Sequence, residues 1–253
     1  MNHRRPPLLL LCLLTCTFSA TAAELEAHLE WAKRTALATP LSGIIERIHV
    51  TPGERVTAGT PLLQLEAREL RAALEAARAA LAYAEQQRQE AQREEQRAQE
   101  LYDRTLLSDH ELHLAQIAAA RANSVWQQAR AQLTRAEVQV QQATLRAPFD
   151  ALVIDLPLRP GEAVSNQFQT TPLAVIAASG HLLAVATVDA EQANRLQLGD
   201  PASVRLGTQQ WSGQISQIGL EPLNDSGYRL VVEFPLAAQS RVRAGQAVII
   251  TLP

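Results

Sequence analysis

Cysteine and methionine are almost absent from this chain of 253 residues. Its two cysteines, Cys12 and Cys16, lie near the start, and Met1 is the one methionine. The remaining sequence offers no thiol for a disulfide, a thiolate metal site or cysteine nucleophilic catalysis. It also offers no thioether ligand of the kind that binds copper. Thiol chemistry and sulfur-ligated metals are therefore excluded from most of the chain.

Long apolar runs are also lacking. A short apolar run at 8–14 follows two arginines, and small residues at 20–23 come after it. This order is typical of a cleaved secretory signal, which we place at residues 1–23. The run is far shorter than the roughly 20 residues that span a bilayer as a helix. We therefore expect an exported protein without an integral membrane segment.

A second interpretation of the first residues stays open. Leu13-Leu14-Thr15-Cys16 resembles a bacterial lipobox, which would make Cys16 an acylated N-terminus. Threonine is a poor residue before the modified cysteine. We therefore rank plain cleavage ahead of a lipid anchor at Cys16.

Concentrated positive charge is missing as well. The chain has 23 basic and 26 acidic residues, and no basic run of the kind that binds nucleic acid.

Nothing in the sequence resembles a Ser-His-Asp set, a phosphate-binding loop or paired acids in a pocket. His110 and His113 share a helix face in a pattern that can bind a metal, but no further ligands cluster near them. We predict a non-catalytic protein with no cofactor, no metal and no nucleic-acid partner.

An internal repeat is present. Pro-Leu-Ser-Gly-Ile-Ile at 40–45 corresponds to Pro-Phe-Asp-Ala-Leu-Val at 148–153, and Pro-Gly-Glu recurs at the same offset. Each copy alternates short leucine or β-branched runs with Pro-Gly turns, the pattern of short strands in a small sheet. One copy alone buries too little apolar surface to be stable. We therefore expect the halves, 38–65 and 144–178, to pack as one domain.

Residues 66–143, between these halves, contain no glycine or proline and consist mostly of Ala, Gln, Glu, Arg and Leu. This is strong helix composition, and two heptad seams rich in alanine run through it. The seams break at 103–109, where Ser108 and Glu111 fit a capping box that starts a second helix. We predict an antiparallel helical hairpin whose arms are some 50 Å long.

The last part of the chain, 179–253, returns to short apolar runs separated by turn signals. These runs predict strands of a small antiparallel β-barrel. We expect the N-terminal segment, 24–37, to join this barrel through a strand at Trp31 to Leu37.

Together these features resemble the membrane fusion protein family (HlyD-type), also called periplasmic adaptors. The specific matches are the motifs at 43–45, 52–56, 146–150 and 243–248. The resemblance implies an elongated α+β fold: a split lipoyl-like (barrel-sandwich hybrid) β domain with an inserted antiparallel α-helical coiled-coil hairpin, followed by a small antiparallel β-barrel. Ala151 stands where the family usually has glycine, and the membrane-proximal domain of many adaptors is not evident.

A sharper match lies at the predicted hairpin tip. Arg97, Leu101 and Ser108 reproduce the family's Arg-x3-Leu-x6-Ser spacing, which in the family docks on an outer-membrane channel. Arginine can donate to carbonyl oxygens at channel helix ends, while leucine is buried and serine forms hydrogen bonds. Ser108 also has a simpler interpretation as a helix cap. The candidate partner-binding set is Arg97, Leu101, Arg104, Leu107 and Ser108.

The resemblance implies a periplasmic adaptor that links an inner-membrane transporter, of the resistance-nodulation-division (RND) or ABC type, to an outer-membrane channel in a tripartite efflux or secretion system. Several copies would self-associate into a ring, with six as one arrangement. The alternative is a periplasmic coiled-coil scaffold or assembly factor without a transport role. A lipoyl or biotinyl carrier is excluded, because the one lysine, Lys33, lies outside the turn that would carry the group.

Overall fold

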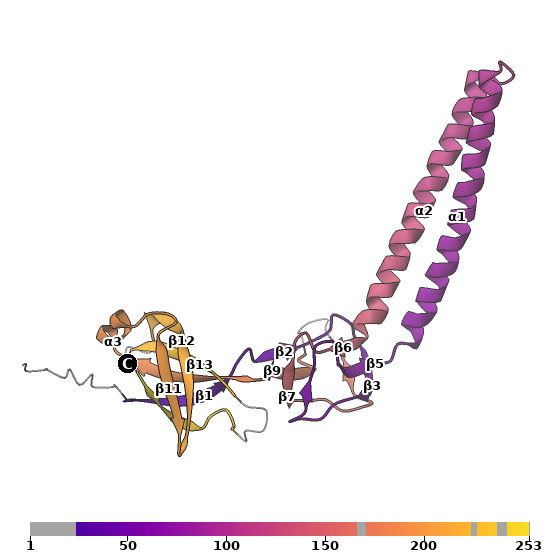
Figure 1. Ribbon diagram of the computed structural model, residues 1–253. Helices are drawn as coiled ribbons and strands as arrows, with labels where there is room; N and C mark the ends of the chain where they lie inside the picture. Colours follow the sequence, from indigo (N-terminus) through magenta and orange to yellow (C-terminus); the bar gives the residue numbers. More distant parts are fainter. Residues whose placement is uncertain (1–23, 166–170, 224–226, 237–241, 253) are drawn as a thin grey trace, which may run out of the picture. The chain divides into compact units, whose positions relative to one another are not determined.

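The computed structural model describes residues 24–165, 171–223, 227–236 and 242–252. The chain divides into two compact units, which Figure 1 shows in colours that follow the sequence. One unit holds residues 33–179, and the other holds 24–32 together with the described residues from 180 onward. The predicted signal at 1–23, which includes Cys16, lies outside the described residues.

Each of the two sheets in the first unit takes strands from both halves of the repeat. The first sheet has the order β2 (Thr35–Leu37), β9 (Ala174–Ala178), β7 (Ala151–Asp155) and β4 (Arg55–Val56). The second sheet has the order β6 (Thr144–Arg146), β5 (Pro61–Leu65), β3 (Gly43–Ile48) and β8 (Ala163–Val164). Neither half forms a sheet alone. The prediction of one shared barrel-sandwich hybrid domain is confirmed.

The two halves exchange equivalent backbone hydrogen bonds. The N–H of Gly53 donates to the carbonyl of Val153, and the N–H of Gly161 donates to the carbonyl of Ile45, both at 2.8 Å. Gly53 and Gly161 have φ values of 90° and 87°, which favour glycine because it lacks a Cβ. The Pro-Gly turns of the repeat therefore carry matching contacts between the halves.

Ala151, the departure from the family's usual glycine, is fully buried in the sandwich core. Its counterpart in the first half is Gly43. A Cβ added at Gly43 would meet side-chain atoms of Leu65 at 3.8 and 3.9 Å, which is ordinary van der Waals contact. A methyl group is thus tolerated at this position of the repeat, and Ala151 contributes to the core.

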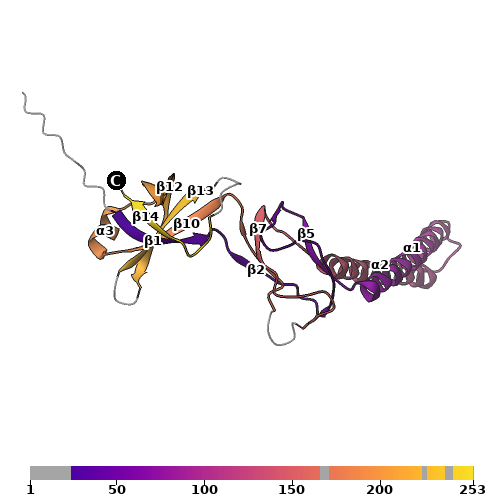
Figure 2. The same ribbon diagram turned by 90° about the horizontal axis from the view of Figure 1, so that it is seen from below.

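Two long helices interrupt the sandwich. They are α1 (Arg68–Asp103) and α2 (Asp109–Gln142), and they lie side by side along most of their length (Figures 1 and 2). Small alanines dominate the buried positions between them, so the helices approach closely. The buried residues are Leu74, Ala84, Leu112, Ala119, Ala129 and Ala136.

The base of the helix pair is bonded to the sandwich. The hydroxyl of Thr39, a buried polar residue, donates to the carbonyl of Gln142 at 2.9 Å. The N–H of Leu65 donates to the carbonyl of Ala143 at 2.8 Å. Within the described part of the chain, no helix is both long and apolar enough to cross a membrane.

The second unit is a closed six-stranded barrel, as predicted. Its order is β1 (Glu24–Trp31), β10 (His181–Val188), β13 (Tyr228–Pro235), β12 (Gln209–Pro222), β11 (Pro201–Leu206) and β14 (Ala247–Thr251). A short helix, α3 (Ala190–Arg195), follows β10. The ring of Trp211 packs against Phe234 with centroids 5.5 Å apart. The largest fully buried residues of this core are Leu29, Leu182, Ile215, Leu230, Phe234 and Ile250.

The expected barrel strand at Trp31 to Leu37 is wrong in its position. The barrel strand is β1, which ends at Trp31, whereas β2 (Thr35–Leu37) pairs with β9 of the sandwich. The chain turns at Lys33, which has a φ of 49°. Sequence alone did not reveal this turn, because a left-handed conformation at lysine has no signature of the kind that glycine provides.

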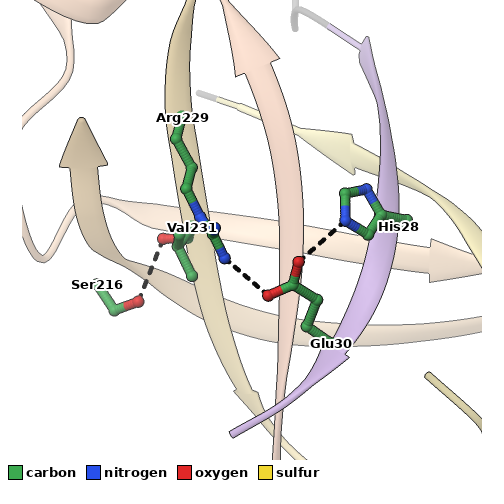
Figure 3. A network of polar contacts seen from close by, with 5 residues as sticks. All are labelled: His28, Glu30, Ser216, Arg229 and Val231. Atoms are coloured by element: carbon green, nitrogen blue, oxygen red, sulfur yellow. Dashed lines mark hydrogen bonds and ion pairs between the residues drawn. The ribbon is translucent and has the colours of Figure 1, made fainter. Parts of the chain in front are cut away.

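On the outside of the barrel, Glu30 connects strands that are not neighbours. A terminal nitrogen of the Arg229 guanidinium on β13 donates to its carboxylate at 2.7 Å, and the ring of His28 on β1 contacts it at 3.1 Å (Figure 3). Strand β10 lies between β1 and β13. These side chains are more than a third exposed, so each contact contributes at most about 1 kcal/mol.

Candidate functional site

The turn between α1 and α2, residues 104–108, is held by two backbone hydrogen bonds at the end of α1. The N–H of Thr105 donates to the carbonyl of Tyr102 at 2.8 Å, and the N–H of Leu106 donates to the carbonyl of Leu101 at 2.9 Å. This pair of bonds is a Schellman motif, which satisfies carbonyls that the helix end leaves free. Thr105 has the left-handed conformation that the motif requires, with a φ of 60°.

Ser108 closes the other side of the turn as the N-cap of α2, which confirms the predicted capping box. Its hydroxyl oxygen accepts from the N–H of Glu111 at 3.3 Å, and its own N–H donates to the Glu111 carboxylate at 3.1 Å. The Ser108 hydroxyl also contacts that carboxylate at 2.7 Å. These hydrogen bonds to the charged form lower the pKa of Glu111 below its ordinary value of 4.5.

The two arginines of the predicted docking set differ in their surroundings. Arg97, on α1, forms an ion pair with Glu94 at 2.6 Å, although its side chain is 64% exposed. Arg104 is exposed at the C-cap of α1, and its guanidinium makes no hydrogen bond or ion pair with any residue that the structure describes. Arg104 is therefore the more available donor to a partner.

The two leucines of the set, Leu101 and Leu107, are both half-buried. Leu101 lies in the last turn of α1, and Leu107 directly precedes the cap of α2. Leu101, Arg104, Leu107 and Ser108 thus lie in the last turn of α1 or in the turn that follows it, whereas Arg97 lies six residues before the end of α1. The structure gives Ser108 a definite bonding role within the chain and leaves Arg104 free.

Leu106 is not part of the docking set that the sequence predicts. Its side chain is 71% exposed, although it is a leucine next to a half-buried leucine. The sequence did hold a signal for this difference, because Leu107 and Leu112 take the N′ and N4 positions around the N-cap Ser108, where apolar side chains often pack together, and Leu107 is half-buried while Leu112 is buried. The end of the helix pair therefore carries two exposed large side chains, Leu106 and the 38% exposed Tyr102, as well as the Arg104 guanidinium, which has no partner among the described residues.

Halfway along the hairpin, an arginine occupies a seam position. The guanidinium carbon of Arg88 lies 4.7 Å from the ring centre of Trp126, and that of Arg130 lies 5.5 Å from it. Arg88 is also paired with Glu85 at 2.7 Å, and its side chain is 24% exposed. Hydrogen bonding from Arg88 lowers the pKa of Glu85, with a smaller contribution from Gln89. This layer replaces the alanine packing found elsewhere between the helices.

The described residues contain no group of three or more His, Cys, Asp or Glu side chains placed to hold a metal. His110 lies in the exposed first turn of α2, and His113 is one turn further along. Lys33 lies in the turn between β1 and β2, and the position where the halves would be joined is occupied by α1 and α2. The candidate functional residues are therefore those near the turn between α1 and α2.

Comparison with known proteins agrees with this architecture. Residues 33–175 match the CzcB-like, barrel-sandwich hybrid domain family. No curated protein matched the chain in a sequence search.

Solved structures of low sequence identity share the fold. The membrane fusion protein Spr0693 from Streptococcus pneumoniae R6 is 18% identical with a TM-score of 0.71, over 91% of this chain and 98% of that one. A MacA-MexA chimera that contains the Pseudomonas aeruginosa MexA α-hairpin domain is 17% identical with a TM-score of 0.70, over 91% and 80%. ZneB from Cupriavidus metallidurans is 21% identical with a TM-score of 0.54, over 91% and 97%.

The family match spans more than half of the chain and ends within four residues of the boundary between the two compact units. The chain therefore belongs to the CzcB-like, barrel-sandwich hybrid domain family.

Proposed function

We propose that this protein is a non-catalytic periplasmic adaptor that links an inner-membrane transporter, of the RND or ABC type, to an outer-membrane channel in an efflux or secretion system. The observation that carries the proposal is the helix pair inserted into the sandwich. Helices of 36 and 34 residues extend roughly 50 Å, and the family's docking spacing lies at their far end.

A projection of this length suits a spacer between two assemblies. The helix pair buries little apolar surface beyond its own alanine seam. A partner would therefore help to offset the conformational entropy lost when the helices order. The tip carries the features of a contact surface, with an exposed leucine and a free arginine on a turn that both helix ends hold in place. We further propose that several copies form a ring, for which six is the first number to test.

The test is photo-crosslinking in the native host from a reactive amino acid at Leu107. We expect capture of an outer-membrane channel, identified by mass spectrometry, and loss of that product when Arg97 and Leu101 are both replaced by alanine. The control position is Gln92, which is exposed midway along α1. Arg88 is unsuitable as a control because its side chain stacks over Trp126.

If a folded, exported chain captures nothing at Leu107 beyond what Gln92 captures, the docking role is refuted. The alternative function, a periplasmic scaffold or assembly factor without a transport role, would then be the better supported of the two. Replacing Gln92 also tests whether the sides of the hairpin meet other proteins, independently of the tip.

A further inference from the structure

The exposed leucines of the barrel unit gather in two neighbouring connections. Among the described residues of this unit, the large apolar side chains that are exposed are Leu198 at 68%, Leu220 at 95% and Leu223 at 44%. Leu198 lies in the connection between α3 and β11, Leu220 lies near the end of β12, and Leu223 directly follows β12. The barrel therefore exposes its large apolar side chains locally rather than over its whole surface.

Strand pairing places both connections at the same end of the barrel. Val188, the last residue of β10, pairs with Tyr228, which in turn pairs with Pro222 at the end of β12. The helix α3 follows β10 at this end and packs against the barrel core through Leu196. Because β1 is antiparallel to β10, it begins at the same end, at Glu24 (Figure 1). We call this the α3 end of the barrel.

The turn that carries Leu198 is fixed by hydrogen bonds. The N–H of Asp200 donates to the carbonyl of Gln197 at 3.2 Å, and the Asp200 carboxylate accepts from the N–H of Gln197 at 2.7 Å. Gly199, which has a φ of 90°, donates its N–H to the carbonyl of Ile215 on β12 at 2.8 Å. Leu198 is therefore held in place while its side chain stays exposed, and a preorganised side chain loses less freedom when it binds.

The hairpin end between β12 and β13 is fixed as well. The N–H of Leu223 donates to the carbonyl of Gly227 at 2.7 Å. A Cβ added at Gly227 would lie 2.5 Å from the carbonyl oxygen of Val188, and one added at Gly219 would lie 3.1 Å from the backbone nitrogen of Arg229. These close approaches need glycine, and they pack the hairpin against the end of β10. The exposed leucines of this hairpin thus belong to a tightly packed segment.

The start of β1 connects the α3 end to the part of the chain that directs export. Glu24 follows residues 1–23, which contain the apolar run at 8–14 and Cys16. If Cys16 carries lipid, the seven residues 17–23 span at most about 25 Å between the bilayer and β1. If the chain is cleaved after 23, it begins at this same end. Both expectations for the N-terminus bring the α3 end, rather than the other end of the barrel, to the membrane.

We propose that the α3 end of the barrel rests on a lipid surface and inserts Leu198, Leu220 and Leu223 at the boundary between the headgroups and the acyl chains. This inference rests on the proposed function, because it takes the periplasmic face of the inner membrane as that surface. Leu220 is five residues from Ile215, to which the Leu198 turn is bonded, and this spacing is about 17 Å along a strand. A bilayer accepts apolar side chains that are so far apart, whereas one small pocket does not.

Charge at the α3 end indicates that apolar contact, rather than attraction to anionic lipid, supplies the affinity. Residues 190–200 and 219–223 contain one basic residue, Arg195, and it forms an ion pair with Glu191. Glu221, in the hairpin, is exposed. Anionic lipids attract clusters of basic residues, whereas apolar binding scales with the buried apolar area. We therefore expect the lipid contact to persist at high salt.

The experiment uses a spin label whose collisions with oxygen report its entry into a bilayer. Residues 24–253 contain no cysteine, so the exported chain can be labelled at one introduced thiol. The test position is Leu220→Cys, and the matched control is Gln210→Cys, which is exposed at the other end of β12. With vesicles of phosphatidylethanolamine and phosphatidylglycerol, we expect the oxygen collision rate to rise several-fold at 220 and to stay unchanged at 210, in low and high salt alike.

The role of the leucines is tested by removing two of them. In the double variant Leu198→Gln and Leu223→Gln, the label at 220 should lose most of its response to vesicles. Leu114→Gln is the control, because Leu114 is a 51% exposed leucine on α2, and it should leave the response unchanged. Circular dichroism checks that each variant keeps its strand content. A full response in the double variant, or equal responses at 220 and 210, would overturn the inference.

This failure is distinguishable from failure of the proposed function. Photo-crosslinking in the native host from Leu220 that captures a membrane protein, without any vesicle response, would show that a protein covers the α3 end. That result would overturn the lipid contact and leave the adaptor function standing. Absence of a channel crosslink from Leu107 would refute the adaptor function, whatever the spin label reports.

Discussion

At the scale of single residues, the Glu111 carboxylate makes the stability of the helix cap at Ser108 depend on pH. Its pKa lies below the ordinary value because the Ser108 hydroxyl and N–H stabilise the carboxylate. A group whose pKa is lower in the folded chain stabilises the fold at pH values above its unfolded pKa, and this contribution is lost as the pH falls through the folded pKa. We therefore expect the cap to be intact at neutral pH and to loosen only in acid, below 4.5.

Nuclear magnetic resonance of the Glu111 side chain and of the Ser108 amide measures this directly. Both signals should titrate together below pH 4.5. In Glu111→Gln, which keeps an acceptor for the Ser108 N–H, the Ser108 amide should lose that titration. A Glu111 carboxyl that titrates at or above its ordinary value would contradict the capping box as the structure has it.

At the scale of elements, the Arg88 and Trp126 layer aligns α1 with α2. The two residues come from different helices, and only the packed helix pair brings them to the same level. A bulky polar and aromatic layer inside an alanine seam penalises any slip of one helix along the other. We expect this layer to determine the register of the hairpin, and with it the positions of the residues at the tip.

Trp126→Leu keeps an apolar side chain but removes the ring that Arg88 and Arg130 face. Each exposed cation-π contact is worth about 0.5 to 1 kcal/mol, so we expect the hairpin to lose roughly 1 kcal/mol. Thermal unfolding followed at 222 nm should show a lower midpoint for α-helix loss. Val125→Ala, at an exposed position on the same helix, should change the midpoint much less. Equal shifts of the unfolding midpoint in the two variants would contradict the prediction that the Trp126 contacts stabilise the helix pair.

At the scale of the whole molecule, the sandwich depends on both halves of the repeat but little on the hairpin. Its two buried clusters are formed by β-strand residues and short connections, with Leu70 of α1 only partly packed against one of them. Replacing residues 68–142 with a short glycine-rich turn should therefore leave the sandwich folded. Deleting β8 (Ala163–Val164) should not, because β8 completes the second sheet beside β3.

The measurement is an amide spectrum of the chain without the hairpin, compared with that of the full chain. Strand resonances should be largely retained, while the channel crosslink is necessarily lost. Broad or collapsed signals would show that the helices stabilise the sandwich, contrary to the arrangement of its buried clusters.

The sequence by itself determined the features that local patterns encode. The absence of glycine and proline from 66–143 predicted the helices, and Ser108 with Glu111 predicted the cap, since composition and short-range hydrogen bonds decide both. The repeat predicted a shared domain, because one copy cannot bury its own apolar face. The resemblance to periplasmic adaptors supplied the docking set, which stays a prediction.

Tertiary structure decided what depends on contacts between distant residues. It placed β2 in the sandwich rather than the barrel and paired strands of one half with strands of the other. It also left Leu106 exposed and Leu107 half-buried, in a turn whose backbone the Schellman motif at Thr105 holds. Spacing along the chain placed the predicted docking set near the turn between the helices, but which side chains there have partners among the described residues depends on bonds that only the folded turn makes.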